Sequence, residues 1–347
     1  MPTTLDQDLA DILEQVGSLW SDIKGARILI TGGTGFFGCW LLESLCCANR
    51  QLGLGARVSV LTRNPGAFLR KAAHLAENPA VELIEGDVLD LPDMPGEYSH
   101  LIHAAGDAST LQFQVDPIRS FNTLVLGTQN ALAWATSKAV DRVLFTSSGA
   151  VYGPQPPHLN RIPEHWLGAP DCASPSAAYA EGKRAAETLC SLYSRRSGLT
   201  VTIARCFAQV GPYLPLDAQY AMGNFIRDAL GGGPIIVSGD GTPYRSYLYA
   251  SDLTTWLWHI LLRGEPGLPV NVGSEEEISV VDLANLVLRM TGGLSVQVRG
   301  TPEPTRRPER YVPETARARA MGLQMHVDLE QAIYRTIAWN RLRSTGR

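Results

Sequence analysis

Residues 30–38 read Ile-Thr-Gly-Gly-Thr-Gly-Phe-Phe-Gly, and this stretch decides the fold. The apolar run at residues 27–31 predicts a short buried strand, and the apolar positions from Phe36 to Leu45 predict a helix directly after it. A turn without side chains lets the backbone approach a pyrophosphate, which then binds the free N–H groups of the helix N-terminus. The glycines have dinucleotide-binding spacing in two overlapping readings: Gly33, Gly35 and Gly38, or Gly32, Gly35 and Gly38.

The composition is that of an ordinary globular chain of 347 residues, of which 45% are hydrophobic. That length has room for one large domain or two modest ones. The formal net charge of −4 includes no basic excess, so nucleic acid and an anionic membrane surface are not expected partners. No apolar run approaches the roughly 18 residues of a membrane-spanning helix, and the N-terminus lacks a basic region followed by an apolar core. We therefore expect a cytoplasmic protein.

The six cysteines are scattered through the chain, without a C-x-x-C pair and without histidines at metal-binding spacing. We expect reduced thiols that mostly fill the core, and no metal site. Cys172 is expected in a loop near the active site, but no neighbouring His or Asp is placed to activate it. It is therefore interpreted as a bystander.

Strand and helix patterns alternate after the glycine turn. Short apolar runs predict strands at residues 57–62, 81–85, 100–104, 142–147 and 200–205. The clearest helical patterns lie at residues 117–138 and 176–196. Regular alternation predicts a Rossmann-type α/β fold, in which helices cover both faces of a doubly wound parallel sheet and ligands bind at the carboxyl ends of the strands.

The two ends of the chain depart from this alternation. Apolar residues between Leu5 and Trp20 recur at spacings of three and four, which predicts an amphipathic helix ahead of the first strand. After residue 205 the chain contains Gly- and Pro-rich loops, and residues 301–313 are expected to be largely loop. Short strands and helices are predicted between these loops, at residues 234–237, 244–249, 252–262, 269–272 and 280–290.

This pattern predicts three parts. An N-terminal helix lies within residues 1–24, and a dinucleotide-binding domain spans residues 25–205. Residues 206–347 are expected to form mainly a smaller α/β lobe that holds the substrate.

Tyr179 and Lys183 stand at positions i and i+4 of a predicted helix, so their side chains share one face. An ammonium group beside a phenol favours the phenolate. Tyrosine has an unperturbed pKa of about 10, and lowering it to about 7 takes roughly 4 kcal/mol of differential stabilisation. A lysine and an oxidised nicotinamide together can supply that stabilisation in a closed site. Ser148, at the end of a predicted strand, completes the set.

These residues together resemble the extended short-chain dehydrogenase/reductase family and, within it, the NAD(P)-dependent nucleotide-sugar epimerase/dehydratase branch. The resemblance runs from Gly25 to about Leu329. It implies Tyr179 as the catalytic base, Lys183 as its partner and Ser148 as a donor to a substrate hydroxyl. It also implies a nucleotide-sugar substrate, a tightly bound dinucleotide that is recycled in each turnover, and a homodimer formed through the two clearest predicted helices.

The resemblance extends to the binding residues. The expected cofactor-binding residues are Gly32, Gly35, Phe36, Phe37, Gly38, Thr62, Arg63, Asp87, Val88, Ala104, Ala105, Ser147, Tyr179 and Lys183. The expected substrate-binding residues are Ser148, Gln209, Asn224, Arg245 and Arg310. Bidentate arginines suit a diphosphate that is held without a metal. The family's substrate-anchoring Asn near the sixth strand is Ala208 here, so the substrate is expected to be seated atypically.

The end of the second predicted strand indicates the choice of cofactor. An acidic residue there would bind the ribose 2′-hydroxyl and repel a 2′-phosphate, whereas this chain has Thr62 and Arg63. The expected cofactor is therefore NAD(P), with NADP favoured.

Gly149 and Ala150 separate the possible reactions. Common sugar 4,6-dehydratases of the family carry an Asp-Glu pair directly after the catalytic hydroxyl residue, and the decarboxylases carry a Glu nearby, where this chain has glycine and alanine. Elimination of water needs an acid and a base, whereas removal and return of a hydride at carbon 4 needs neither. The first interpretation is therefore a nucleotide-sugar 4-epimerase that oxidises the sugar at carbon 4 through Tyr179.

Three alternatives stay open. In the first alternative, the enzyme keeps the keto intermediate for dehydration or decarboxylation. Residues 179–184 are close to the decarboxylase version of this helix, and Arg310-Tyr311 is close to the dehydratase version. The second is an NADP-dependent carbonyl reductase that consumes free cofactor. The third is a non-catalytic protein that senses a dinucleotide, against which the intact set of Ser148, Tyr179 and Lys183 argues.

Overall fold

A parallel sheet forms the centre of the molecule in the computed structural model, which describes residues 4–106, 115–218, 220–303, 305 and 307–345. Seven strands of the described chain pair in the order β11-β6-β5-β4-β1-β2-β3. Their bounds are β1 (Arg27–Thr31), β2 (Arg57–Thr62), β3 (Val81–Glu85), β4 (His100–His103), β5 (Arg142–Ser148), β6 (Thr200–Cys206) and β11 (Pro269–Val272). The order reverses between β1 and β4, where an open α/β sheet forms its ligand crevice. The predicted Rossmann-type fold is confirmed.

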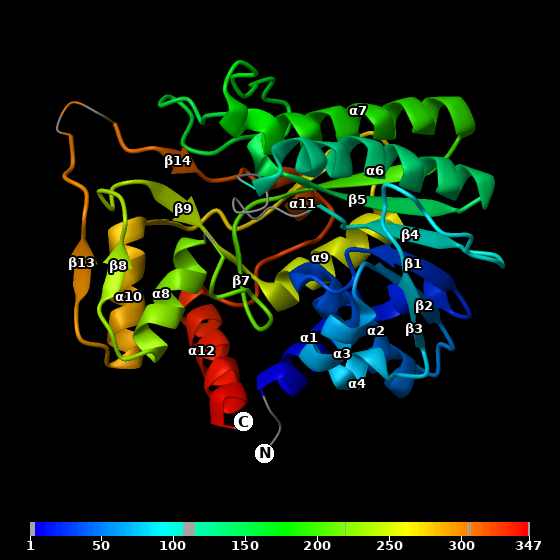
Figure 1. Cartoon of the computed structure of the whole chain (residues 1–347), viewed down its shortest axis with the longest axis horizontal. Coiled ribbons are helices and arrows are strands. Elements are labelled where there is room, and N and C mark those ends of the chain that lie inside the picture. The colour runs from blue at the N-terminus through cyan, green and yellow to red at the C-terminus, as the bar shows by residue number, and fades with distance from the viewer. Residues whose placement is uncertain (1–3, 107–114, 219, 304, 306, 346–347) are drawn as a thin grey trace.

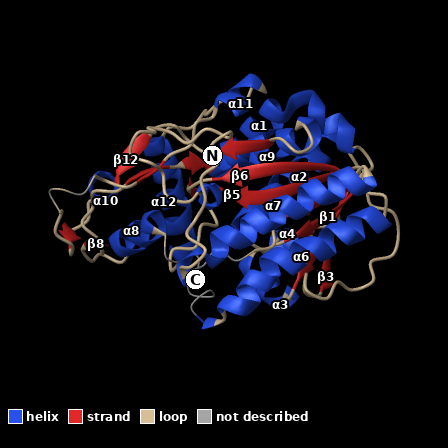
Figure 2. Cartoon of the chain, turned by 90° about the horizontal axis from the view of Figure 1, so that it is seen from above, coloured by secondary structure: helices blue, strands red, loops and turns tan. Residues whose placement is uncertain are grey.

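Helices cover both faces of this sheet (Figures 1 and 2). On one face α6 (Pro117–Ser137) and α7 (Ala178–Ser197) lie side by side over Leu101 and Val143. On the other face α2 (Phe36–Leu52) and α9 (Ala250–Arg263) pack over Ile102 and Leu144. Neighbouring strand residues point to opposite faces, so each strand contributes to both cores. The observed bounds agree with the predicted ones to within about two residues. Helix α7 begins at Ala178 rather than at residue 176, because a 3-10 turn, η3 (Pro175–Ala177), precedes it.

The N-terminal segment is a packing element. The predicted helix forms α1 (Thr4–Val16) and continues as a 3-10 helix, η1 (Gly17–Ile23), because Gly17 has a positive φ of +55° that an α-helix cannot continue through. The indole of Trp20 lies 5.2 Å from that of Trp258, measured between ring centroids. The buried carboxylate of Asp8 accepts a hydrogen bond from the Tyr249 hydroxyl at 2.7 Å. These contacts join the start of the chain to α9 and its neighbours.

The C-terminal part divides between the central sheet and a smaller lobe with its own apolar core. Strand β11 pairs with β6, and α9 packs on the sheet, so both belong to the Rossmann layer structure. The strands of the lobe are β7 (Gln209–Val210), β8 (Ile235–Val237), β9 (Tyr244–Ser246), β10 (Leu248–Tyr249), β12 (Glu277–Ser279), β13 (Val296–Val298) and β14 (Arg310–Tyr311). Its helices are α8 (Ala221–Leu230), α10 (Val280–Thr291) and α12 (Leu329–Thr345), whereas α11 (Ala316–Ala320) packs against β11 of the central sheet.

One local prediction for this part needs correction. The strand predicted at residues 244–249 is two strands, β9 and β10, which belong to different small sheets. The described residues of the segment 301–313 are largely loop, as predicted, but include β14, which pairs in parallel with β9. Periodicity could not find a strand of two residues, because its stability comes from a partner that is remote in sequence.

Candidate active site

The glycine turn between β1 and α2 is closed by backbone contacts that exclude side chains. Gly32 has a φ of +74°, and a Cβ atom there would lie 2.4 Å from the carbonyl oxygen of Ala104. A Cβ atom on Gly38 would lie 2.3 Å from the backbone of Gly33. Gly35 caps α2 without a side chain, so the first N–H groups of the helix have no partner within it. This is the geometry that binds a pyrophosphate.

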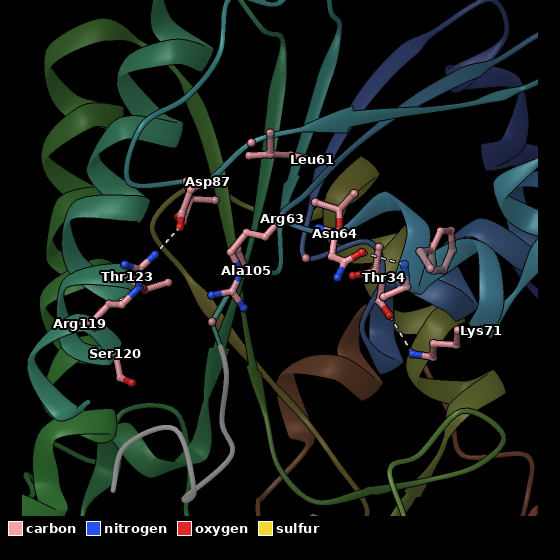
Figure 3. A pocket seen from close by; sticks show the side chains of 17 residues that line it. Thr34, Leu61, Arg63, Asn64, Lys71, Asp87, Ala105, Arg119, Ser120 and Thr123 are labelled. Carbon is pink, nitrogen blue, oxygen red and sulfur yellow. Dashed lines mark hydrogen bonds and ion pairs between the residues drawn. The ribbon is translucent and has the colours of Figure 1, made fainter. Parts of the chain in front are cut away.

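A cavity of about 300 Å³ opens beside this turn (Figure 3). Its lining includes six of the predicted cofactor-binding residues: Gly32, Thr62, Arg63, Asp87, Val88 and Ala105. Arg63 extends into the middle of the cavity in Figure 3. Ala104 lies behind Gly32, while Phe36 and Phe37 begin α2 and pack against the apolar cores. The residues fit the adenosine part of a dinucleotide.

Six further polar residues line this cavity that the predicted set of site residues lacked: Thr34, Asn64, Lys71, Arg119, Ser120 and Thr123. Lys71 donates from Nζ to the Thr34 carbonyl oxygen at 2.7 Å, which ties α3 (Pro65–Lys71) to the glycine turn. Arg119 forms an ion pair with Asp87 at 2.8 Å. Asn64 caps α3, and the Asn-Pro sequence before that helix was a usable signal. The contacts of Lys71 and Arg119 depend on the fold and left no mark in the local sequence.

Helix α7 brings Tyr179 and Lys183 against the end of β5, as predicted. The buried Lys183 ammonium donates to the Thr146 carbonyl oxygen at 2.6 Å, and burial lowers the pKa of Lys183 to about 8. Burial raises the pKa of Tyr179 well above its ordinary value, and a hydrogen bond with Ser148 opposes this in part. The lysine alone therefore does not make Tyr179 a phenolate in this structure, which agrees with the expectation that an oxidised nicotinamide is needed as well.

Ser147 and Ser148 point to different partners because neighbouring strand residues face opposite sides. The Ser147 hydroxyl donates to a Glu187 carboxylate oxygen at 2.5 Å. That carboxylate is held by the Arg205 guanidinium, with a shortest distance of 2.6 Å. Of these two serines, Ser148 is the one hydrogen-bonded to Tyr179.

A buried histidine lies beneath the crevice and was not predicted. Thr128 donates its hydroxyl to the Leu124 carbonyl oxygen at 2.6 Å, so it accepts from Nε2 of His103 at 3.0 Å. Nδ1 of His103 then accepts from the Thr31 hydroxyl at 2.7 Å, and Thr31 accepts from the Ala105 N–H group at 3.3 Å. Burial lowers the pKa of His103 to about 3, so this network stays neutral and fixed near pH 7.

The predicted substrate-binding residues come from the smaller lobe. Arg245 lies close enough to Tyr311 and Tyr247 for its charge to lower their pKa values, although burial keeps both raised. Arg310 forms an ion pair with Glu277 and stacks on the Tyr244 ring. The structure therefore places Arg245 near the catalytic tyrosine region and gives Arg310 an acidic partner.

Two amides complete the predicted set. Gln209 is buried, and its Nε2 lies within 3.4 Å of the carbonyl oxygens of Phe207 and Val272. Its Oε1 is buried without a hydrogen-bond partner in the described part of the chain. Asn224, on α8, accepts a hydrogen bond from Arg227 at 3.0 Å.

The described residues include neither a candidate metal site nor a candidate membrane-spanning helix. No group of three or more His, Cys, Asp or Glu residues in this part of the chain could hold a metal ion. No helix among the same residues is long and apolar enough to cross a bilayer. Five of the six cysteines are buried free thiols, and Cys172 is exposed.

Comparison with known proteins identifies the class that this fold and site define. The model of the NAD-dependent epimerase/dehydratase family matches residues 28–273. The chain therefore belongs to that family, in the extended short-chain dehydrogenase/reductase group. It is a nucleotide-sugar-modifying enzyme with a nicotinamide dinucleotide cofactor, as the sequence predicted.

The individual relatives are enzymes with named reactions. UDP-glucuronic acid decarboxylase 1 of Xenopus tropicalis is 32% identical over 91% of this chain and 72% of its own length. UDP-glucuronic acid decarboxylase 5 of Arabidopsis thaliana is 31% identical over 88% of this chain and 87% of its own. A dTDP-glucose 4,6-dehydratase of Streptomyces venezuelae, solved with NAD, has a TM-score of 0.77 at 25% identity, over 92% and 98% of the two chains.

A third kind of enzyme shares the fold. UDP-glucose 4-epimerase of Thermotoga maritima, solved with UDP-glucose, superposes with a TM-score of 0.77 at 22% identity, over 92% of this chain and 99% of its own. Epimerases and dehydratases therefore share this architecture, so the architecture alone does not select the reaction.

We predict that Tyr179→Phe lowers turnover by about 10²- to 10⁴-fold, because it removes the hydroxyl that transfers a proton. Cofactor affinity should stay within a few fold, since the ring and its packing are kept. Steady-state kinetics and cofactor titration of the same preparation check both parts. Full activity in the variant would refute the assignment of Tyr179 as the base.

Proposed function

We propose that this enzyme oxidises carbon 4 of a nucleotide-linked uronic acid and releases carbon 6 as CO₂. Decarboxylation was an alternative in the sequence analysis, ranked below 4-epimerisation. The observation that carries it is the identity of 31–32% with UDP-glucuronic acid decarboxylases over about nine tenths of the chain. The geometry around Ser148 and Tyr179 is compatible with this reaction and favours it over dehydration.

The catalytic group acts on the sugar hydroxyl at carbon 4. Ser148 and Tyr179, hydrogen-bonded to each other, hold this hydroxyl, and Tyr179 accepts its proton. The bound dinucleotide supplies the hydride acceptor and the positive charge that favours the phenolate. Lys183, held by the Thr146 carbonyl oxygen, places its ammonium beneath the same site.

The absence of a carboxylate after Ser148 counts most against dehydration, although the family's decarboxylases also carry a Glu nearby. Oxidation at carbon 4 turns the carbon 6 carboxylate into a β-keto acid, which loses CO₂ without removal of a proton from carbon 5. Dehydration requires a base at carbon 5 and an acid for the leaving hydroxyl. Gly149 and Ala150 offer neither.

The carboxylates on the neighbouring elements are engaged elsewhere. Glu164 accepts from the Asn271 N–H group at 3.1 Å, and Glu187 binds Arg205. Glu181 lies 3.6 Å from Arg184. All three glutamates line a second cavity, of about 580 Å³, beside α7. Their placement argues against a glutamate that replaces the missing acid at Ser148.

The substrate contacts follow from charge and burial. The Arg245 guanidinium is proposed to bind the diphosphate, since it lies near the catalytic region. Arg310 would do so only in exchange for its partner Glu277. The buried Oε1 of Gln209 suits a sugar hydroxyl as donor, because an unpaired buried oxygen is costly.

A 4-epimerase is the second candidate. The same two residues, Gly149 and Ala150, favour it, because hydride removal and return needs no further acid or base. The two candidates share the oxidation step and differ in whether carbon 6 is lost.

The test is incubation of the pure enzyme with UDP-glucuronic acid in D₂O, without added cofactor. We expect CO₂ and a UDP-pentose that carries one solvent deuterium at carbon 5. A mixture of two uronic acid epimers without solvent deuterium would instead establish 4-epimerisation. A product lighter by one water would establish dehydration. Mass spectrometry and NMR separate the three outcomes.

We further propose NADP as the preferred cofactor, since Arg63 enters the cavity beside the second strand. Arg63→Ala should weaken NADP binding by about 10-fold or more, which is the loss of one charge-assisted hydrogen bond, and change NAD binding little. The matched control is Arg70→Ala, an exposed arginine of α3 outside the cavity lining. Fluorescence titration with both cofactors measures the ratio, and equal losses would make Arg63 a bystander.

A homodimer through α6 and α7 is also proposed. These helices expose Ile118 (73%), Leu126 (45%) and Leu192 (57%) on the surface away from the sheet. Leu126→Glu should shift sedimentation from dimer to monomer, whereas Leu294→Glu, at an exposed leucine of the smaller lobe, should not. A monomeric wild-type protein at micromolar concentration would contradict the proposal.

A further inference from the structure

Tyr311 is a second phenol at the catalytic serine. Strand β14 places it by pairing Tyr311 with Arg245 of β9. The residues after Tyr311 are held by Ile162. Its carbonyl oxygen accepts from the Glu314 N–H group and its N–H group donates to the Val312 carbonyl oxygen, each at 2.9 Å. The phenol lies within hydrogen-bonding reach of Ser148, and its ring packs on Phe207 with 4.6 Å between centroids, where the Phe207 ring lies against Gly149. A segment predicted as loop therefore delivers a fixed hydroxyl to the active site.

The Ser148 hydroxyl joins the two phenols. Its oxygen accepts from the Ala150 N–H group at 3.1 Å, and it is hydrogen-bonded to both Tyr179 and Tyr311. A hydroxyl has one proton and two lone pairs, so these three contacts fill Ser148, and the carbon 4 hydroxyl binds there in exchange for one of them. Burial raises the pKa values of both phenols, so without the dinucleotide both carry their protons near pH 7, and the charge of a bound dinucleotide would favour the phenolate of Tyr179.

Decarboxylation at this site requires two separate protons. Tyr179 takes the proton of the carbon 4 hydroxyl and returns it when the ketone is reduced. Loss of CO₂ leaves an enolate across carbons 4 and 5, and carbon 5 needs a proton of its own. The overall change is R–COO⁻ + H⁺ → R–H + CO₂, so this second proton comes from solvent through a second acid.

We infer that Tyr311 is the acid that protonates carbon 5, an inference that rests on the proposed decarboxylation. The Tyr311 O–H bond breaks as the C5–H bond forms, and the phenolate recovers a proton from water. Carbon 5 is bonded to carbon 4, whose hydroxyl binds Ser148 and Tyr179, so a phenol on the same serine is near it. Gly149 and Ala150 carry no ionisable group, so the acid comes from another element, and Tyr311 is the phenol that β14 brings to Ser148.

The test is Tyr311→Phe, which keeps the ring contact with Phe207, at 4.6 Å between centroids, and removes the hydroxyl. In a single turnover with UDP-glucuronic acid, cofactor reduction and CO₂ release should proceed near the wild-type rates. Formation of the pentose should slow by about 10²-fold or more. Reduced cofactor should then accumulate, because the hydride returns only after carbon 5 is protonated. In D₂O, deuterium at carbon 5 should lose its single configuration.

Tyr193→Phe is the matched control, at a tyrosine on α7 that lies outside the site, and it should behave as wild type. Pentose formation by Tyr311→Phe at the wild-type rate, with one deuterium configuration, would overturn the inference and leave decarboxylation standing. Loss of cofactor reduction in Tyr311→Phe would overturn it as well, because the hydroxyl would then act before CO₂ leaves. Wild-type enzyme that releases no CO₂ would overturn the proposed function itself.

Discussion

The close backbone approach at the carboxyl end of β1 is the constraint on which the rest of the site depends. A side chain on Gly32 would collide with Ala104, and one on Gly38 would collide with Gly33. Only a chain free of Cβ atoms here lets β4 and α2 pack this close to β1. The His103 and Thr31 hydrogen bonds then lock the neighbouring strand ends. The cofactor cavity and the start of α2 both open from this fixed point.

Side chains on three successive turns of helix α7 contact the end of β5. Tyr179 is hydrogen-bonded to Ser148, Lys183 binds the Thr146 carbonyl oxygen, and Glu187 accepts from Ser147. Three consecutive strand residues are thus held by three side chains at intervals of four along one helix. The contacts of Lys183 and Glu187 hold α7 against β5, and they therefore position Tyr179 at the start of the same helix. This anchoring is independent of which reaction follows the oxidation.

The smaller lobe decides what happens after carbon 4 is oxidised. The family's usual acidic positions are Gly149 and Ala150, and the nearby glutamates line the second cavity beside α7. The hydroxyl of Tyr311 reaches Ser148 from β14 instead. In the proposed reaction, the step that follows oxidation would be carried by a short strand, β14, whose position depends on pairing with β9. Substitutions there would change the reaction without disturbing the Rossmann layers.

The sequence by itself determined the Rossmann layers, the glycine turn and the Ser148, Tyr179 and Lys183 set. The layers, the glycine turn and the pairing of Tyr179 with Lys183 are local features that periodicity and spacings of one to four residues encode, whereas Ser148 joined the set through the family resemblance. Only the tertiary structure showed that Tyr311 joins this set, that His103 braces the crevice, and that β11 completes the central sheet. Their partners lie tens to more than a hundred residues away along the chain. Contacts over such separations are set by packing of the whole fold, which leaves no pattern in either segment alone.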